Sequence, residues 1–110
     1  MASPERVARV ARALQQVLAE LIAREVKDPR VQGVTITDVD VSRDLAHARV
    51  YLAFSHENIA ETLKGFEKAS GFLRKRVGEE LDLRITPSLK FYHDPAVKAG
   101  GRMDDILSRL

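Results

Sequence analysis

Cysteine and tryptophan are both absent from this chain of 110 residues, and aromatic residues make up only 5% of it. Without cysteine the protein forms no disulfide, no thiolate zinc site and no thiol nucleophile. No apolar run approaches the roughly 18–20 residues that span a bilayer, and the N-terminal residues lack the apolar segment of a signal peptide. A hydrophobic fraction of 45% and a charged fraction of 31% are ordinary for a globular protein. We therefore expect a soluble, cytoplasmic, single-domain protein.

Motifs for catalysis and metal binding are missing too. The three histidines, at positions 47, 56 and 93, lack metal-ligand spacing such as HExxH. No GxSxG, P-loop or dinucleotide-binding fingerprint occurs. The acidic pairs Glu79-Glu80 and Asp104-Asp105 are neighbours in sequence, so on helices their side chains point in different directions. The sequence predicts a protein that is not an enzyme and uses no cofactor or metal.

The first part of the chain predicts a helix. Ser3 and Pro4 are typical of a helix start, and apolar residues recur at helical spacing over residues 7–22. Asp28-Pro29 is expected to end this helix, because proline disfavours the helical conformation in the residue before it.

A β-hairpin is predicted next, with strands at Val34–Val41 and His47–Phe54 and turn-forming residues at 42–44. The second strand alternates between apolar and polar residues, as a strand with one buried face does. In the first strand the apolar residues fall on both parities, which indicates a bulge or apolar contact on both faces.

Residues 58–81 carry a long helical pattern, and Asn58 with Glu61 resembles a capping box. Ala69-Ser70-Gly71 lies in the middle of this pattern. Because glycine inside a helix costs about 1 kcal/mol relative to alanine, either a kink or a helix–turn–helix joint is plausible here. A single helix that tolerates the glycine is the other interpretation.

A third strand is predicted at Leu89–His93, and a short C-terminal helix at Met103–Leu110 after the flexible joint Gly100-Gly101. The predicted fold is therefore α+β, in the order α-β-β-α-(kink)-α-β plus the terminal helix. A three-stranded sheet with the helices on one face would bury every apolar stripe and leave its other face partly open. We place the core at residues 4–95 and treat 96–110 as a C-terminal extension.

Charge is segregated along the chain although the formal net charge is only +2. The cluster Lys64, Lys68, Arg74, Lys75 and Arg76 faces a single acidic residue in the same stretch. Around a helix break, such side chains and freed backbone N–H groups would meet phosphates; a solvated helix face is the simpler interpretation. With so few aromatic residues, recognition of structured RNA by shape and backbone fits better than base stacking.

The sequence resembles the ribosome-binding factor A family of bacterial small-subunit assembly factors. The resemblance rests on Asp28-Pro29-Arg30, on VTITDVDVSRDLAHARVYLAF (34–54), on Ala69-Ser70-Gly71 with the three residues after it, and on LRITPSLKF (83–91). It implies a type II KH-like fold in which Ala69-Ser70-Gly71 stands where ordinary KH domains carry a GxxG loop. The single-strand clamp of such a loop is therefore not expected.

The resemblance also implies binding to the 16S rRNA of the small (30S) subunit late in maturation, a link to 5′-end processing, and growth in the cold. Small-subunit proteins and a releasing assembly GTPase are further implied partners, and we expect a monomer that does not bind membranes. The RNA-contact residues predicted from the matched positions, the kink motif and the basic cluster are Arg30, Lys64, Lys68, Ser70, Gly71, Arg74, Lys75, Arg76, Arg84 and Lys90.

Two alternatives to this function remain at this point. A protein-interaction module without an RNA role would use the partly apolar strand Val34–Val41 as an open edge. A generic KH-type protein would bind free single-stranded RNA. Salt distinguishes the first alternative, because binding through several phosphates weakens steeply between about 50 and 200 mM salt.

Overall fold

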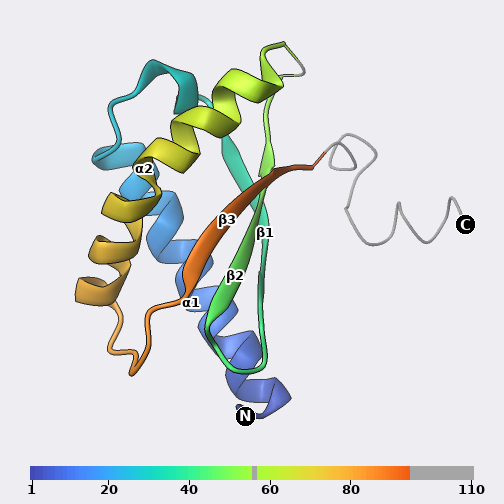
Figure 1. The fold of residues 1–110 in the computed structure, drawn as a ribbon, viewed down its shortest axis with the longest axis vertical. Coiled ribbons are helices and arrows are strands. Elements are labelled where there is room, and N and C mark those ends of the chain that lie inside the picture. The colour runs from blue at the N-terminus through green and yellow to red at the C-terminus, as the bar shows by residue number, and fades with distance from the viewer. Residues whose placement is uncertain (56, 95–110) are drawn as a thin grey trace, which may run out of the picture.

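The computed structural model describes residues 1–55 and 57–94, which form two long helices, a short 3₁₀ helix and three strands. Their order is α1 (Pro4–Arg24), η1 (Pro29–Val31), β1 (Thr35–Val41), β2 (His47–Ala53), α2 (Ile59–Glu80) and β3 (Ser88–His93). Both long helices lie on the same side of the sheet (Figure 1), as the sequence predicted. The predicted helix at 103–110 and the glycine pair before it lie outside the described residues.

β2 is the central strand of the sheet, pairing antiparallel with β1 and parallel with β3. The predicted hairpin and third strand are therefore confirmed. Parallel pairing of β2 with β3 requires a crossover, and α2 provides it. Since α1 contacts β1 and α2 contacts β3, one face of the sheet is covered by helices.

The predicted irregularity in the first strand is a β-bulge at Thr37. Ile36 pairs with Leu52, and the next pair is Asp38 with Tyr51. The extra residue puts Ile36 and Val39 on the same buried face, although their spacing in the sequence is odd. The Thr37 hydroxyl lies 2.8 Å from a carboxylate oxygen of Asp94, whose residue is 4% exposed.

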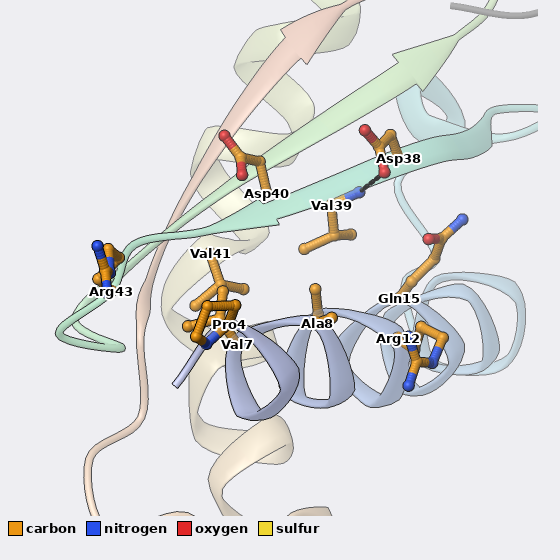
Figure 2. A pocket seen from close by; sticks show the side chains of 11 residues that line it. Pro4, Val7, Ala8, Arg12, Gln15, Asp38, Val39, Asp40, Val41 and Arg43 are labelled. Atoms are coloured by element: carbon orange, nitrogen blue, oxygen red, sulfur yellow. Dashed lines mark hydrogen bonds between the residues drawn. The ribbon is translucent and has the colours of Figure 1, made fainter. Parts of the chain in front are cut away.

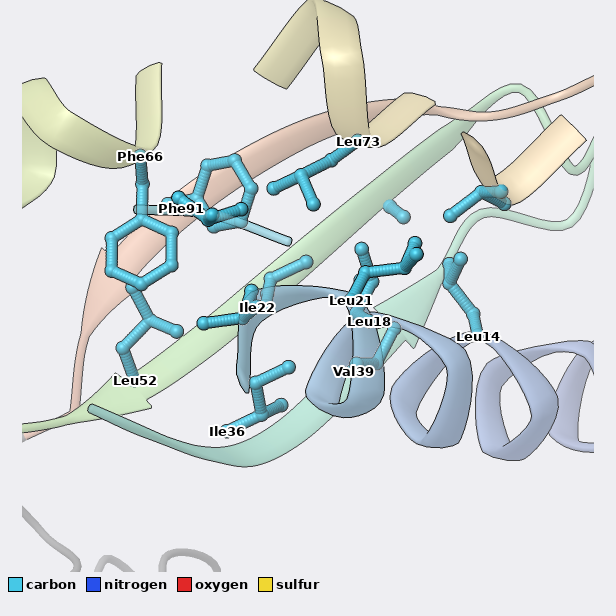
Figure 3. Close-up of a cluster of buried hydrophobic side chains, with 14 of the residues drawn as sticks. Leu14, Leu18, Leu21, Ile22, Ile36, Val39, Leu52, Phe66, Leu73 and Phe91 are labelled. Atoms are coloured by element: carbon cyan, nitrogen blue, oxygen red, sulfur yellow. The ribbon is translucent and has the colours of Figure 1, made fainter. Parts of the chain in front are cut away.

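The hydrophobic core lies between the helices and the sheet (Figure 3). α1 contributes Leu14 and Leu18, β2 contributes Leu52, and α2 contributes Phe66 and Leu73, all of them 0% exposed. Truncating a buried leucine or phenylalanine to alanine typically costs about 2–5 kcal/mol. The orientation of α2 against the sheet is therefore fixed by its buried side.

The first helix ends earlier than predicted, at Arg24, with Glu25 as its C-cap. Asp28-Pro29 begins η1 instead: the Asp28 carboxylate accepts a hydrogen bond from the Arg30 backbone N–H at 2.9 Å. The early end lets Val26 and Val31, at 8% and 1% exposure, both reach the core. This burial is a tertiary effect that local signals do not contain.

The predicted capping box at the start of α2 is wrong. Asn58 has φ 58° and makes no side-chain capping hydrogen bond. Through Ala69-Ser70-Gly71 the helix is continuous, so the backbone N–H groups there are not freed by a break. Its axis nevertheless changes direction near the middle (Figure 1), where the Ser70 hydroxyl donates to the carbonyl oxygen of Glu67 at 2.7 Å. Such side-chain bonds often bend helices.

We predict that Thr37→Val destabilises the protein because it removes the hydroxyl that donates a hydrogen bond to the buried Asp94 carboxylate. The expected loss is about 1–3 kcal/mol in the free energy of unfolding, measured by urea denaturation. Thr35→Val is the matched control: it makes the same change at an exposed position of β1 and should stay within about 0.5 kcal/mol. Equal effects of the two variants would contradict the role of the Thr37–Asp94 contact.

Candidate RNA-binding surface

Lys64, Lys68, Gly71 and Lys75 lie along one exposed face of α2. We call this set the lysine stripe. The spacing of its members follows the helical repeat, so together they extend over about 16 Å. Phe66, Leu73 and Val77, on the opposite side, are 0% exposed. Packing therefore directs the stripe outward from the domain.

Two of these lysines form no close ion pair with the described residues, although the charge of Lys68 does act on Asp28. Lys68 and Lys75 form no ion pair there, whereas the Lys64 ammonium lies 3.7 Å from Glu61. A partner's phosphates would therefore meet Lys68 and Lys75 without first displacing an acidic side chain of this part of the chain.

Gly71 is the one glycine of the stripe, and packing among the described residues does not require a glycine at this position. A Cβ added at Gly71 would meet nothing within 4 Å. At Gly65 it would lie 3.1 Å from Arg30 and Val31 of η1, and at Gly78 it would lie 2.9 Å from the Thr86 hydroxyl. Gly65 and Gly78 thus allow other segments to pack on the helix, while Gly71 leaves helix backbone open to a partner.

A hollow of about 540 Å³ continues the stripe toward the loop before β3. It is lined by Gly71, Arg74, Lys75, Gly78, Arg84, Ile85 and Thr86. The Arg74 guanidinium donates to the carbonyl oxygen of Thr86 at 2.9 Å and so holds the loop against α2. The structure therefore brings together Gly71, Arg74, Lys75 and Arg84 from the predicted set. Ser70, beside Gly71, has its hydroxyl engaged by Glu67.

Arg76 points away from the hollow, toward the end of α1. Its guanidinium lies 3.0 Å from Glu25, 2.8 Å from Glu79 and 3.8 Å from Glu80. The hydrogen bonds that Arg76 donates to Glu25 and Glu79 raise the pKa of Arg76, and the bond to Glu25 lowers the pKa of that carboxylate. Three carboxylates share this charge, so the geometry gives Arg76 a role in joining α2 to α1.

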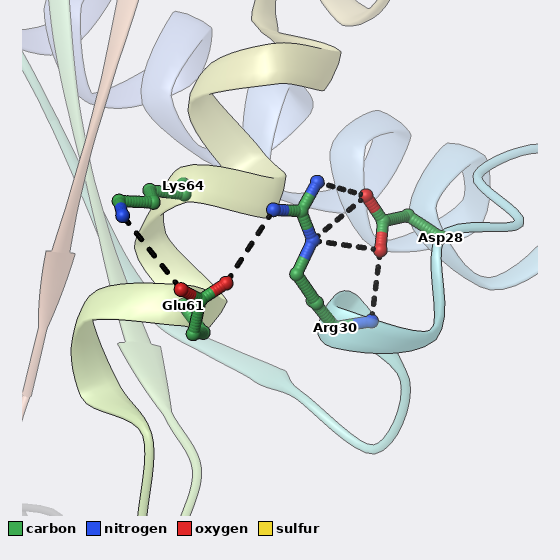
Figure 4. Close-up of polar contacts among 4 residues, drawn as sticks. All are labelled: Asp28, Arg30, Glu61 and Lys64. Atoms are coloured by element: carbon green, nitrogen blue, oxygen red, sulfur yellow. Dashed lines mark hydrogen bonds and ion pairs between the residues drawn. The ribbon is translucent and has the colours of Figure 1, made fainter.

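Arg30 is likewise held by carboxylates (Figure 4). Its guanidinium lies 2.7 Å from Asp28 and 3.7 Å from Glu61. Hydrogen bonds from the Arg30 side chain and backbone lower the pKa of Asp28 to about 2, and the charge of Lys68 adds to the shift. The ion pairs of Asp28, Arg30 and Glu61 therefore lie beside the stripe and fix η1 to the first turn of α2.

Lys90 lies far from the stripe, on the face of the sheet that carries no helix. In the parallel register of β2 and β3 it pairs with Arg49. Arg49 was not among the RNA contacts predicted from the sequence, although strand alternation had already placed its side chain outward. The register of a parallel pair, which the sequence does not display, was the missing information.

A groove of about 570 Å³ lies between α1 and β1 (Figure 2). Its floor is apolar, with Val7, Ala11 and Val41, and Arg12 and Asp40 lie among its polar lining.

No group of three or more side chains suited to hold a metal occurs within residues 1–55 and 57–94. Over the same residues, no helix is long and apolar enough to cross a membrane.

The element order, the sheet order and the exposed basic helix define a small α+β protein of the KH-like class. The family model described as "Ribosome-binding factor A" matches residues 6–107. The ribosome-binding factor A of Pseudomonas syringae is 44% identical over 108 residues, covering 94% of this chain and 78% of that protein. The protein of that name from Shewanella sediminis is 41% identical over 108 residues, covering 96% and 76%. The chain belongs to the ribosome-binding factor A family.

Solved structures agree with this membership. The crystal structure of ribosome-binding factor A from Thermus thermophilus superposes with a TM-score of 0.74 at 25% identity, covering 79% of this chain and 93% of that one. A Thermus thermophilus model of the factor, fitted into a cryo-EM map of a 30S–RbfA complex, gives a TM-score of 0.63 at 29% identity, covering 74% and 88%. The type II KH-like fold implied by the resemblance is consistent with these neighbours.

Acid is predicted to weaken the fold through Asp28. Because its folded pKa of about 2 lies below the ordinary 3.8, the charged pair contributes stability above about pH 4. That contribution disappears as the pH falls toward 2. Asp28→Asn keeps the capping oxygen but not the charge, so its stability deficit should shrink over this range in urea titrations. Asp82→Asn, an exposed residue with no ion pair to the described residues, is the control; a deficit that does not change with pH would contradict the assignment.

Proposed function

We propose that this protein is a non-enzymatic assembly factor that binds the small ribosomal subunit and its 16S rRNA through the lysine stripe. The observation that carries the proposal is the outward row of Lys64, Lys68, Gly71 and Lys75, in which two lysines form no ion pair with the described residues. Family membership and the 30S complex of the Thermus relative support it. We take residues 1–110 as one KH-like RNA-binding domain that acts as a monomer in the cytoplasm.

Recognition on this surface is by backbone and shape. Lysine ammonium groups contact phosphates, which position a protein on RNA without reading sequence. Gly71 lets a sugar or phosphate approach the helix between Lys68 and Lys75, where any side chain would stand in the way. Arg74 and Arg84 extend the positive surface along the hollow. Double-stranded RNA is recognised largely in this manner.

Binding would act on the subunit by stabilising one RNA arrangement over another. A ligand shifts such an equilibrium only by its difference in affinity for the two states. Moving a 1:99 ratio to 99:1 takes about 5.5 kcal/mol. In this proposal the protein holds a late precursor, favours 5′-end processing and supports growth in the cold. An assembly GTPase then releases it, and small-subunit proteins contribute contacts.

A protein-interaction function is the second candidate, favoured by the apolar groove beside β1, which is an edge strand of the sheet. Edge strands can pair with an added strand of a partner. Apolar burial of that kind responds little to salt, so the salt dependence measured below separates the two functions.

Replacing Lys68 and Lys75 together by glutamine should weaken small-subunit binding in sedimentation assays. Loss of two phosphate contacts should also reduce the slope of log K against log salt by roughly 2. The matched control is Arg9→Gln with Arg24→Gln, which removes the same charge from exposed positions of α1 that line neither the hollow nor the groove. Equal losses from both double variants, or an unchanged slope, would contradict a binding role for the stripe.

Gly71→Ala should stabilise the protein and at the same time weaken its binding. The added methyl meets open space inside the domain, and alanine is favoured over glycine in a helix by up to about 1 kcal/mol. Urea unfolding should show the gain, and sedimentation with small subunits the loss. Unfolding cannot explain weaker binding by a more stable variant. Gly78→Ala, whose methyl would lie 2.9 Å from the Thr86 hydroxyl, should lower stability instead. Undiminished subunit binding by Gly71→Ala would contradict a close approach of RNA at this position.

A further inference from the structure

The face of the sheet that carries no helix presents an ordered set of side chains from its two parallel strands. On β2 the outward residues are His47, Arg49 and Tyr51, and on β3 they are Ser88, Lys90 and Tyr92. The parallel register pairs Arg49 with Lys90 and Tyr51 with Tyr92. Two aromatic rings and two cations therefore lie side by side on this face.

The two tyrosines form one aromatic surface. Their ring centroids lie 5.5 Å apart and their planes are inclined by 26°, which is a stacked arrangement. Both residues are half-buried. With both helices on the other side of the sheet (Figure 1), no described helix covers the rings. Stacked aromatic side chains on an open sheet are a platform on which unpaired bases can stack.

A hollow of about 470 Å³ adjoins this platform. Its charged lining comprises Arg43, Arg49 and Lys90 together with the carboxylate of Asp40, and His47 and Tyr92 also border it. Asp40 is already occupied by Arg49, at 2.7 Å. Arg43 and Lys90 form no ion pair with any described residue. The lining is thus positive beside an aromatic surface, and its volume falls within the roughly 300–1,000 Å³ of ligand pockets.

We propose that this face is a second RNA site, which binds unpaired, single-stranded RNA. A base stacks on Tyr92, and the adjoining phosphates lie against Lys90 and Arg43. Cations beside aromatic rings are the usual combination in single-strand binding. The site goes beyond the proposed function, because the lysine stripe lies on the helical side of the domain and this face on the other. The protein can then hold two RNA segments at once.

The test uses the full chain and a fluorescein-labelled ten-nucleotide oligouridylate, with binding followed by fluorescence polarisation at about 50 mM salt. Tyr92→Leu, which keeps an apolar residue but removes the ring, should weaken binding roughly tenfold, as loss of one stacked base does. Lys90→Gln should also weaken it and should reduce the salt dependence. The Arg9→Gln, Arg24→Gln double variant, which removes charge from exposed positions of α1 outside both surfaces, is the control and should bind the oligonucleotide like the unaltered protein.

Tyr92→Trp gives a second readout that does not depend on removing the ring. The chain has no tryptophan, so this residue would be its single indole fluorophore, and a base stacked on it should quench the emission. No oligonucleotide binding by the unaltered protein, or unquenched emission at saturation, would overturn the proposal. Equal losses in Tyr92→Leu and in the Arg9→Gln, Arg24→Gln control would do so as well.

A decaaspartate peptide, added as a competitor of the labelled oligouridylate, tests whether the site binds any polyanion rather than RNA. Competition by this peptide as strong as that by unlabelled oligouridylate would overturn a preference for RNA. Small-subunit sedimentation of the same variants keeps the two proposals distinct. If the oligonucleotide binds but the subunit does not, only the proposed function fails; if the subunit binds but the oligonucleotide does not, only the second site fails.

Discussion

Phe66, Leu73 and Val77 fix the rotation of α2 about its own axis, and the outer surface of the domain depends on that constraint. All three are 0% exposed, and the ring of Phe66 lies 5.0 Å from that of Phe91 on β3. Gly65 and Gly78 admit η1 and the loop before β3 on the flanks of the helix. Because the buried side cannot turn outward without opening the core, the lysines on the opposite side keep one orientation relative to the sheet. A binding surface on a helix of this kind is preorganised by hydrophobic packing rather than by its own polar contacts.

Electrostatics then separates two pairs of cations on α2 and η1. Arg30 and Arg76 each contact carboxylates from another segment of the chain, and their ion pairs tie η1 and α1 to α2. Lys68 and Lys75 have no such partner among the described residues. Guanidinium groups suit fixed, bidentate pairing, whereas an ammonium group on a flexible stem suits a phosphate whose position varies. This chemistry accords with the contacts of the four residues, in which Arg30 and Arg76 hold the fold and Lys68 and Lys75 form no ion pair with the described residues.

The parts of the fold that could be predicted from the sequence are those with local causes. Ser3 and Pro4 start α1 as expected. The change of parity in β1 indicated either a bulge or apolar contact on both faces, and the structure has the bulge, which realigns the apolar residues on one buried face. The end of α1 depends on the burial of Val26 and Val31, which is a tertiary effect. Within the basic cluster, adjacency in sequence suggested one surface, yet a helix turns about 100° per residue. Arg74 therefore reaches Thr86, while Arg76 reaches Glu25 on the other side.

The helix-free face depends on a constraint of a different kind. A hairpin fixes the register of β1 against β2 through its turn, but nothing local fixes the register of β3, which arrives by way of α2. Phe91 sets the register of β3, because its side chain lies between the sheet and α2 and its ring contacts that of Phe66. Once Phe91 lies opposite Val50, alternation places Lys90 beside Arg49 and Tyr92 beside Tyr51. The contact that orients the lysine stripe on one side of the domain thereby also aligns the aromatic and cationic side chains on the other. The geometry of both surfaces is determined by the packing of one helix against one strand.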